Sequence, residues 1–260
     1  ELNTLNFDIS NSGSITLDTL TMELLPVENL IAVTSSIIEI ASLYPGIQGS
    51  AGPFEIDVNS QAISGTIVPM ELIITTDEGF YQTQVYDIQL GLISQSDPLG
   101  PDLYGYYIYD SGDTSYDIAP IYDWIELNNG LELGTEMDFH DTGDGTGYNL
   151  FQIVELPFQF RFYGLEYNEI IVYSDGYISF GDNEVPSHRN YPIPGAGGPS
   201  PMVAAFWDDL KTTSNAEIYK YSGENYFIIE WSEMRTHNNN HVETFQIILY
   251  DNTSLTPTGD

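Results

Sequence analysis

The chain has 260 residues, no cysteine, and 39 acidic against 5 basic side chains, for a formal net charge of −34. A surface this negative repels phosphate groups, so we exclude nucleic-acid binding through a basic face and electrostatic attachment to anionic lipid. Without thiols there is no disulfide, no thiolate metal site and no cysteine nucleophile. The longest apolar run, residues 202–207, is far shorter than the ~20 residues of a membrane-spanning helix, so we predict no transmembrane segment.

The charges divide the chain into two parts. Apolar residues make up 42% and aromatic residues 13%, which indicates a folded protein rather than an acidic disordered tail. Residues 1–102 hold 14 acidic and no basic side chains, and all five basic residues and all four histidines come later. Together with the Pro- and Gly-containing segment 94–102, this step predicts a boundary. We therefore predict a first domain at residues 1–91, a linker at 92–102 and a second domain at 103–260.

The first part alternates apolar and polar residues with the period of a half-buried strand. Clear examples are residues 5–9, 20–24, 54–58 and 70–74. Asp77-Glu78-Gly79 predicts a hairpin turn before the strand at 80–90. About seven short strands in roughly 90 residues are typical of a β-sandwich.

The second part has the same period and more aromatic residues. Its predicted strands are residues 124–127, 150–156, 158–163, 170–173, 177–180, 203–207, 218–221, 226–231 and 244–250. Asp175-Gly176 is the strongest hairpin signal, and the Pro- and Gly-rich residues 188–201 predict a long loop. No long window has a helical period with caps. We predict an all-β fold of two β-sandwich domains in tandem, mostly antiparallel.

Residues 156–210 carry a distinctive pattern. Its parts are Phe-Tyr-Gly at 162–164, Asp-Gly at 175–176, Ser-Phe-Gly at 179–181 and Ala-Ala-Phe-Trp-Asp-Asp at 204–209. This pattern resembles the nidogen-like module. It is also similar to a module downstream of the catalytic domain in large secreted bacterial peptidases. Those peptidases are of gingipain type (cysteine) or subtilisin-like (serine), and are often exported by the type IX secretion route.

The resemblance covers nearly the whole chain. Residues 102–127 are similar to the opening of that module, and residues 244–251 and 257–260 to its closing segment, after which the family has one more strand. Residues 1–91 resemble the Ig-like or CARDB-like sandwich module that precedes it. The resemblance implies a non-catalytic accessory region, secreted or at the bacterial cell surface, with the parent's catalytic residues outside this chain. Residues 1–8 lack the features of a signal peptide, so we expect a piece of a longer polypeptide.

Calcium is the cofactor that the residues favour. Hard cations take several carboxylate and carbonyl oxygens. Two loops concentrate such groups, one at Asp110, Asp113 and Asp117 and the other at Asp141 and Asp144. The alternative is that Asp, Ser and Gly only form turns at these places.

Other constellations are weaker. Glycoside hydrolysis needs two carboxylates across a cleft. Asp208 and Asp209 are adjacent, so on a strand they face opposite ways and do not form such a pair. Glu230 lies on one side of Trp231. Glu233 lies on its other side. His237 and His241 have the spacing of a helical zinc site, but three asparagines between them favour a loop. Neither a Gly-x-Ser-x-Gly elbow nor a phosphate-binding Gly-rich loop with Lys occurs, so we expect no enzyme activity from this chain.

Tyrosines gather before the second core. Tyr104, Tyr106, Tyr107 and Tyr109 either pack in a core or between domains, or form an exposed face for a ligand or partner. Three functions stay open: an accessory region that spaces, stabilises or docks its parent, a carbohydrate- or protein-binding adhesin module, and a structural subunit. The last would self-associate by strand exchange at an open sheet edge, which the absent final strand motivates.

Overall fold

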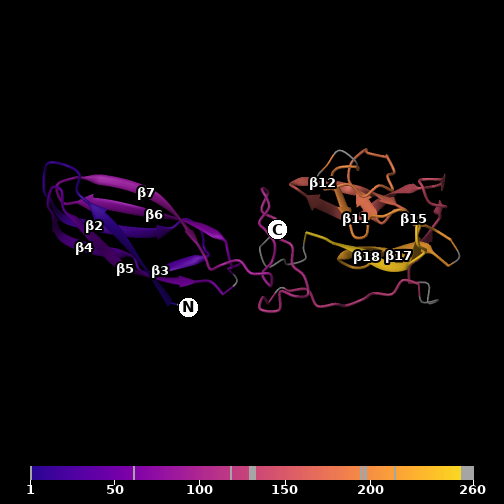
Figure 1. The fold of residues 1–260 in the computed structure, drawn as a ribbon, viewed down its shortest axis with the longest axis horizontal. Helices are drawn as coiled ribbons and strands as arrows, with labels where there is room; N and C mark the ends of the chain where they lie inside the picture. Colours follow the sequence, from indigo (N-terminus) through magenta and orange to yellow (C-terminus); the bar gives the residue numbers. More distant parts are fainter. Residues whose placement is uncertain are drawn as a thin grey trace. The chain divides into compact units, whose positions relative to one another are not determined.

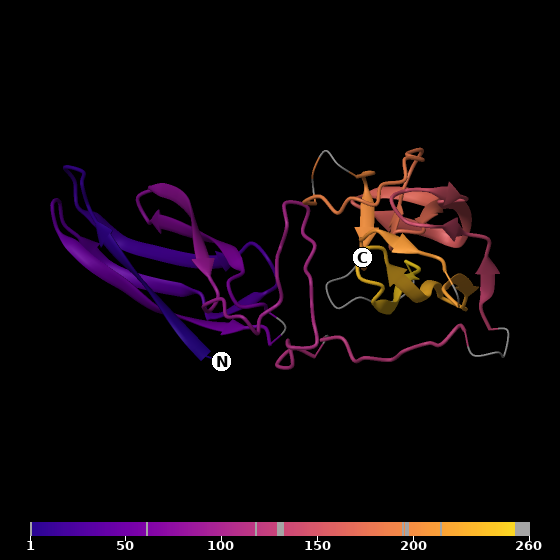
Figure 2. The ribbon, with the colours of Figure 1, turned by 45° about the vertical axis from the view of Figure 1, so that its right-hand side comes forward.

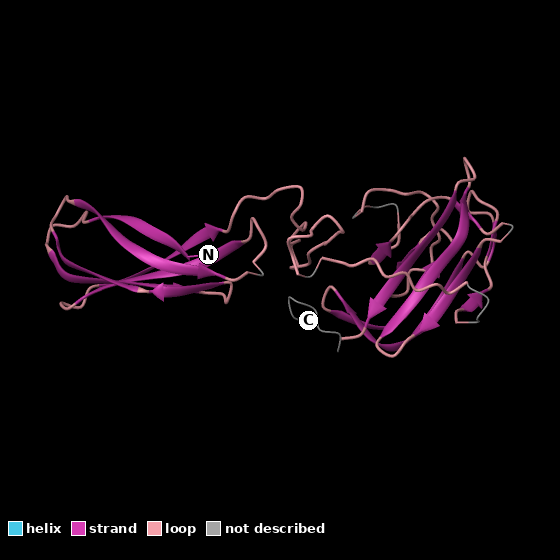
Figure 3. Ribbon diagram, turned by 90° about the horizontal axis from the view of Figure 1, so that it is seen from below, coloured by secondary structure: helices cyan, strands magenta, loops and turns pink. Residues whose placement is uncertain are grey.

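The computed structural model describes residues 2–60, 62–117, 119–128, 133–193, 195, 198–213 and 215–252. Every regular element in this part of the chain is a β-strand, and the strand pairs are antiparallel, which confirms the predicted fold class (Figure 3). Among the same residues there is no helix long and apolar enough to cross a membrane. The chain divides into two compact units, Glu1–Tyr122 and Asp123–Asp260.

The described residues of the first unit form seven strands in two sheets (Figure 1). One sheet has the order β1-β5-β3 and the other β4-β2-β6-β7. The strands are β1 (Leu2–Ser10), β2 (Leu17–Pro26), β3 (Ile31–Ser35), β4 (Ile37–Leu43), β5 (Gln48–Val58), β6 (Ile67–Thr76) and β7 (Tyr81–Gln89).

Alternating residues of both sheets form the core of the first unit. Met22 and Leu24 of β2 and Met70 of β6 pack with Phe54 and Ile56 of β5 in one buried cluster. These are the apolar positions of the period-two pattern, so one face of each strand is buried and the other meets solvent. The predicted hairpin at Asp77-Glu78-Gly79 connects β6 and β7.

Residues 103–122 belong to the first unit, although the charge step led us to place them in the second domain. The described residues of this segment, 103–117 and 119–122, form no strand (Figure 2). The Tyr116 hydroxyl donates to the carboxylate of Asp97 at 2.7 Å and to Ser64 Oγ at 3.3 Å. Aromatic side chains therefore attach this segment to the first sandwich. A prediction of the boundary from charges alone does not take such contacts into account.

The second unit has two main sheets and a small hairpin. The sheets have the orders β11-β12-β13-β14 and β15-β17-β16-β8, β18 pairs with β17, and β9 pairs with β10. The strands are β8 (Thr135–Met137), β9 (His140–Asp141), β10 (Gly147–Tyr148), β11 (Phe151–Phe162), β12 (Leu165–Tyr173), β13 (Tyr177–Ser179), β14 (Met202–Ala204), β15 (Leu210–Lys211), β16 (Glu217–Ser222), β17 (Tyr226–Thr236) and β18 (Val242–Tyr250). Residues 257–260, compared with a closing segment above, lie outside the described residues.

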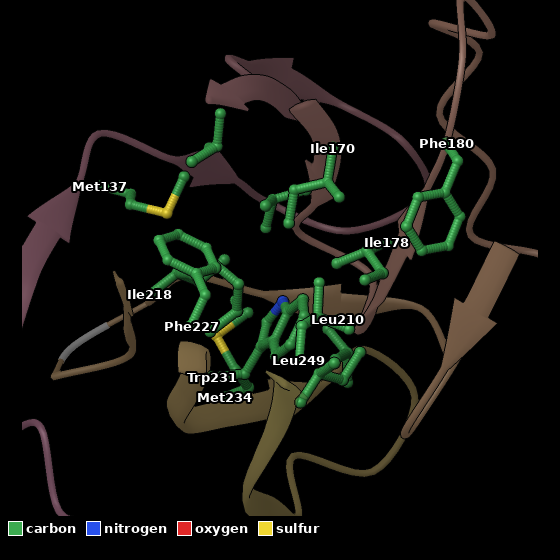
Figure 4. Close-up of a cluster of buried hydrophobic side chains, with 14 of the residues drawn as sticks. Met137, Ile170, Ile178, Phe180, Leu210, Ile218, Phe227, Trp231, Met234 and Leu249 are labelled. Carbon is green, nitrogen blue, oxygen red and sulfur yellow. The ribbon is translucent and has the colours of Figure 1, made fainter. Parts of the chain in front are cut away.

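The core of the second unit lies between its two main sheets. Ile170 and Ile178 of one sheet and Ile218, Phe227 and Trp231 of the other belong to a single buried cluster (Figure 4). The indole N–H of Trp231 donates to the carbonyl of Tyr173 at 2.9 Å, so the largest buried side chain also links the sheets. The predicted strands at 150–156 and 158–163 form one strand, β11, whose pairing register shifts between Glu155 and Phe160.

The prediction of a strand at residues 124–127 is wrong. Residues 123–128, here called the strap, make no strand and lie over the outer face of the β16–β17–β18 sheet, where Leu127 packs against Tyr219 and Ile228. The amide of Leu127 donates to Glu230 Oε2 at 3.0 Å. Side chains of the sheet thus satisfy the strap's backbone, so its alternating apolar residues need no strand partner.

Candidate metal centre

Five aspartates from three turns meet at one end of the second unit. We call Asp141, Asp144, Asp175, Asp208 and Asp209 the aspartate cluster. Asp141 and Asp144 come from the β9–β10 hairpin, Asp175 from the turn between β12 and β13, and the last two from the segment before β15. Three of them are more than nine-tenths buried, with exposed fractions of 1% for Asp141, 2% for Asp175 and 7% for Asp209.

Hydrogen bonds hold the cluster together. Asp141 accepts from the amide of Gly143 at 2.8 Å and from the Ser174 hydroxyl at 2.5 Å. The amide of Asp144 donates to Asp209 Oδ1 at 2.9 Å. Asp175 Oδ1 accepts from the amide of Leu210 at 3.0 Å. The hairpin signal at Asp175-Gly176 therefore marks a buried junction as well as a turn.

Burial and mutual repulsion make the charged form of the carboxyl groups in the aspartate cluster unfavourable. Burial raises the pKa of Asp175 to about 8, against the hydrogen bond from Leu210, and the charges of Asp141, Asp209 and Asp208 raise it further. Burial also raises the pKa of Asp141, although its bonds from Ser174 and Gly143 oppose the shift. Buried carboxylates of this kind need either a proton or a cation.

Two histidines flank the β9–β10 hairpin. Gly143 has a φ of +92°, and a Cβ at this position would lie 1.9 Å from His237 Nδ1. Gly145 has a φ of +65°, and a Cβ there would lie 3.1 Å from His188 Nδ1. Asp144 stands between these glycines, with its Oδ2 at 3.4 Å from His237 Nε2. Ligand atoms of Asp144, His188 and Asp209 all lie within 4.8 Å of one another, the single such group among the described residues.

The aspartates that the sequence suggested for calcium fall in different surroundings. Asp144 belongs to that group of three, and Asp141 lies in the aspartate cluster. Asp110 and Asp113 accept backbone hydrogen bonds within their own turn, at 2.6 Å from Gly112 and 2.7 Å from Asp110. Asp117 is exposed. Calcium at these positions stays a prediction.

Sequence reasoning did not select His188, Asp209 or Asp175 as partners of the β9–β10 hairpin. Each lies between 31 and 68 residues further along the chain, as counted from Asp144 to Asp175 and from Asp141 to Asp209. His237 and His241 do not pair, since His237 contacts Asp144 while His241 is exposed. The one available signal was the run of aspartates at Asp208-Asp209 after an aromatic strand.

A separate pair of carboxyl groups consists of Glu126 in the strap and Glu230 of β17 beneath it. Glu230 has no exposed surface, and its Oε2 accepts from Leu127 and from Gln246 Nε2 at 2.9 Å. Its Oε1 accepts no hydrogen bond from the described residues. Burial raises the pKa of Glu230, and the charge of Glu126 and a side-chain hydrogen bond between the two carboxyl groups raise it further. Although burial acts to raise it, bonds from Trp124, Asn128 and Glu230 hold the pKa of Glu126 below its ordinary value. Glu233, by contrast, is exposed.

The four tyrosines divide into two kinds. Tyr104 and Tyr106 are 55% and 39% exposed, and their rings stack with centroids 5.3 Å apart. Tyr107 lies with its hydroxyl 3.5 Å from Thr66 Oγ1, and Tyr109 packs edge-on against Tyr116. The structure thus supports packing for the second pair and an exposed aromatic surface for the first.

An apolar pocket of about 370 Å³ opens beside the long loop of the second unit. Its aromatic walls are Phe162, Tyr163 and Trp207, and several prolines complete it. The Trp207 indole donates to the carbonyl of Ser187 at 2.7 Å, so this wall is fixed in place.

Comparison with known proteins gives a family match in the second unit. Residues 132–255 match a family model described as NIDO related. This match supports the nidogen-like module that the sequence led us to expect. A module of this class is an accessory rather than a catalytic part of a protein, and such domains are in general extracellular. Neither the search of curated proteins nor the search of solved structures returned a match.

Proposed function

We propose that this chain is a non-catalytic accessory region of a larger secreted or cell-surface bacterial protein. The observation that carries the proposal is the nidogen-related match over residues 132–255, together with a second all-β unit in tandem. The sheets of such a fold form a rigid scaffold that presents surface residues and loops to a partner. Spacing, stabilising or docking the parent is the work that suits them.

We further propose that the parent is a peptidase of the gingipain or subtilisin-like class, exported by the type IX route. The support is the motif resemblance at residues 156–210. The full-length reading frame tests it: a peptidase domain upstream is expected. A reading frame that contains these units without any catalytic domain would refute the proposal that the parent is a peptidase. The accessory role would then be tested by fractionation of cells and medium.

A second candidate function is binding of carbohydrate or of a surface protein through Tyr104 and Tyr106. The stacked, exposed rings favour it, because exposed tyrosines stack on sugars and anchor protein interfaces. A glycan array with the whole chain is the test. Hits that disappear in Tyr104→Ala/Tyr106→Ala and persist in Tyr44→Ala, a control at a tyrosine 60% exposed, support it. Unchanged hits in the double variant refute it.

Self-association is the third proposal. The outer edge of β18 pairs with no other described strand, so a strand of a neighbouring copy has a place to add. Light scattering over a range of concentrations measures it directly, and a constant monomer mass would exclude assembly by strand exchange.

A further inference from the structure

We infer that Asp144, His188 and Asp209 bind one divalent transition-metal ion of the zinc class. The inference concerns this unit's own side chains and holds whether or not the parent is a peptidase. Its first support is distance. In a tetrahedral site with bonds of about 2.0–2.2 Å, neighbouring ligand atoms are roughly 3.5 Å apart. Ligand atoms already within 4.8 Å of one another need only small side-chain rotations to reach that arrangement.

The second support is the unbalanced buried charge behind the three ligands. Asp175 and Asp209 are nine-tenths buried or more, and each carboxylate accepts a backbone hydrogen bond, Asp175 from Leu210 and Asp209 from Asp144. No lysine or arginine in the described part of the chain forms an ion pair with them. The amino group of Lys211, the nearest base in sequence, instead bonds Asn240 at 2.7 Å. Buried carboxylates without a counter-charge are costly, and a bound cation removes that cost.

The third support is that His188 is held in place before any ion arrives. Its neighbour Ser187 donates from its amide to the Tyr177 hydroxyl at 2.9 Å and accepts from the Trp207 indole at 2.7 Å. Tyr177 is completely buried, so both anchors are rigid. Gly145 leaves the space that the imidazole occupies. A ligand held in this way loses little conformational entropy on binding.

The ligand types select the metal. Calcium prefers six to eight oxygen ligands, whereas an imidazole with two carboxylates suits zinc and its neighbours in the first transition row. His237 Nε2, at 3.4 Å from Asp144 Oδ2, orients that carboxylate and acts as a positioning residue. The calcium predicted from the sequence for Asp141 and Asp144 is therefore the competing outcome of the test.

The consequence is a cross-link in a chain without cysteine. One ion would join the β9–β10 hairpin, the long loop that carries His188 and the segment leading into β15. Loops joined in this way are stabilised by mass action whenever the ion binds the folded state alone.

The test uses the whole chain without a histidine tag, stripped with a chelator. Zn²⁺ is titrated calorimetrically in excess Mg²⁺, because a formal charge of −34 attracts divalent ions non-specifically. We expect one Zn²⁺ per chain, a higher Tm with Zn²⁺ than with Ca²⁺, and a visible absorption band when Co²⁺ replaces Zn²⁺. In Asp144→Asn and His188→Gln, affinity should fall more than about 100-fold.

Two controls separate this site from the acidic surface and from misfolding. His241→Gln and Asp182→Asn change an exposed histidine and an exposed aspartate outside the group, and both should bind Zn²⁺ like the parent chain. The metal-free Tm of Asp144→Asn should equal that of the parent chain, since this side chain is 73% exposed. The inference is overturned if Zn²⁺ does not bind, if the ligand variants bind as the controls do, or if Ca²⁺ raises the Tm and Zn²⁺ does not.

Discussion

Two loops of this chain look alike in sequence and differ in structure. Residues 110–117 and 138–149 both combine Asp with Gly, Ser or Thr. In the first loop, Asp110 and Asp113 accept hydrogen bonds from amides of their own turn, so their charges serve local structure. In the second, Asp144 meets Asp209 and a histidine from another loop. An aspartate-rich loop becomes a ligand cluster only where the fold brings distant residues to it.

The carboxyl pair between the strap and β17, Glu126 and Glu230, shows a third solution to the same electrostatic problem. Glu230 is as buried as Asp141 and Asp175 of the aspartate cluster, but it has one carboxyl neighbour, Glu126, instead of several. A single shared proton is enough to remove the repulsion there. At the edge of the aspartate cluster, the carboxylates of Asp144 and Asp209 and the imidazole of His188 have ligand atoms within 4.8 Å of one another, an arrangement that could hold a metal ion.

The largest expected effect compares glycines in the two loops. Gly143→Ala places a Cβ at 1.9 Å from His237 Nδ1 in a backbone with φ of +92°, so we expect it to lower the free energy of unfolding by about 3 kcal/mol. Gly112→Ala is the matched control. Its Cβ would meet only the movable carboxylate of Asp110, and we expect a loss below about 1 kcal/mol. Calorimetry of the whole chain measures both, and equal losses would contradict the contrast between the loops.

The next prediction concerns pH and the Glu126–Glu230 pair. Because the folded pKa of Glu230 is raised from 4.5, the folded chain keeps a proton that the unfolded chain releases. This contribution to stability is complete below the unfolded pKa and is lost as pH rises through the folded pKa. Glu230→Gln keeps the shape and donates an N–H to Glu126 at every pH. The variant should match the parent chain near pH 4.5 and exceed it in stability at pH 8.

Urea unfolding followed by tryptophan fluorescence measures this difference. The three tryptophans lie at positions 124, 207 and 231, all in the second unit, so the signal reports the unit that contains the pair. Taking the difference between variant and parent at each pH cancels every other titrating group. A difference that stays constant between pH 4.5 and pH 8 would show that Glu230 is not the proton-holding member.

Local patterns predicted most of the fold and little of the site. Period-two alternation located β5 and β6, because one buried face per strand leaves that mark in any sequence. The same signal misled at residues 124–127, where alternating side chains lie on a sheet without joining it. The site depends on contacts between His188, Asp209 and the β9–β10 hairpin, which residue spacing does not encode. The sequence selected Asp141 and Asp144 as candidate ligands because turn chemistry is local, and calcium at these residues stays a prediction.

The smallest expected effects separate stability from metal binding, one loop at a time. Asp113 is 3% exposed and its carboxylate accepts from the amide of Asp110, so Asp113→Ala should cost about 1 kcal/mol. It should leave the affinity for Zn²⁺ unchanged. Asp144→Asn should do the reverse: an asparagine tolerates the φ of +54°, so unfolding without metal changes by less than about 0.5 kcal/mol, while Zn²⁺ affinity falls. Calorimetric unfolding and titration of both variants check the pair. If Asp113→Ala weakened Zn²⁺ binding as strongly as Asp144→Asn does, the two loops would share one function, and the difference between them would be a matter of degree.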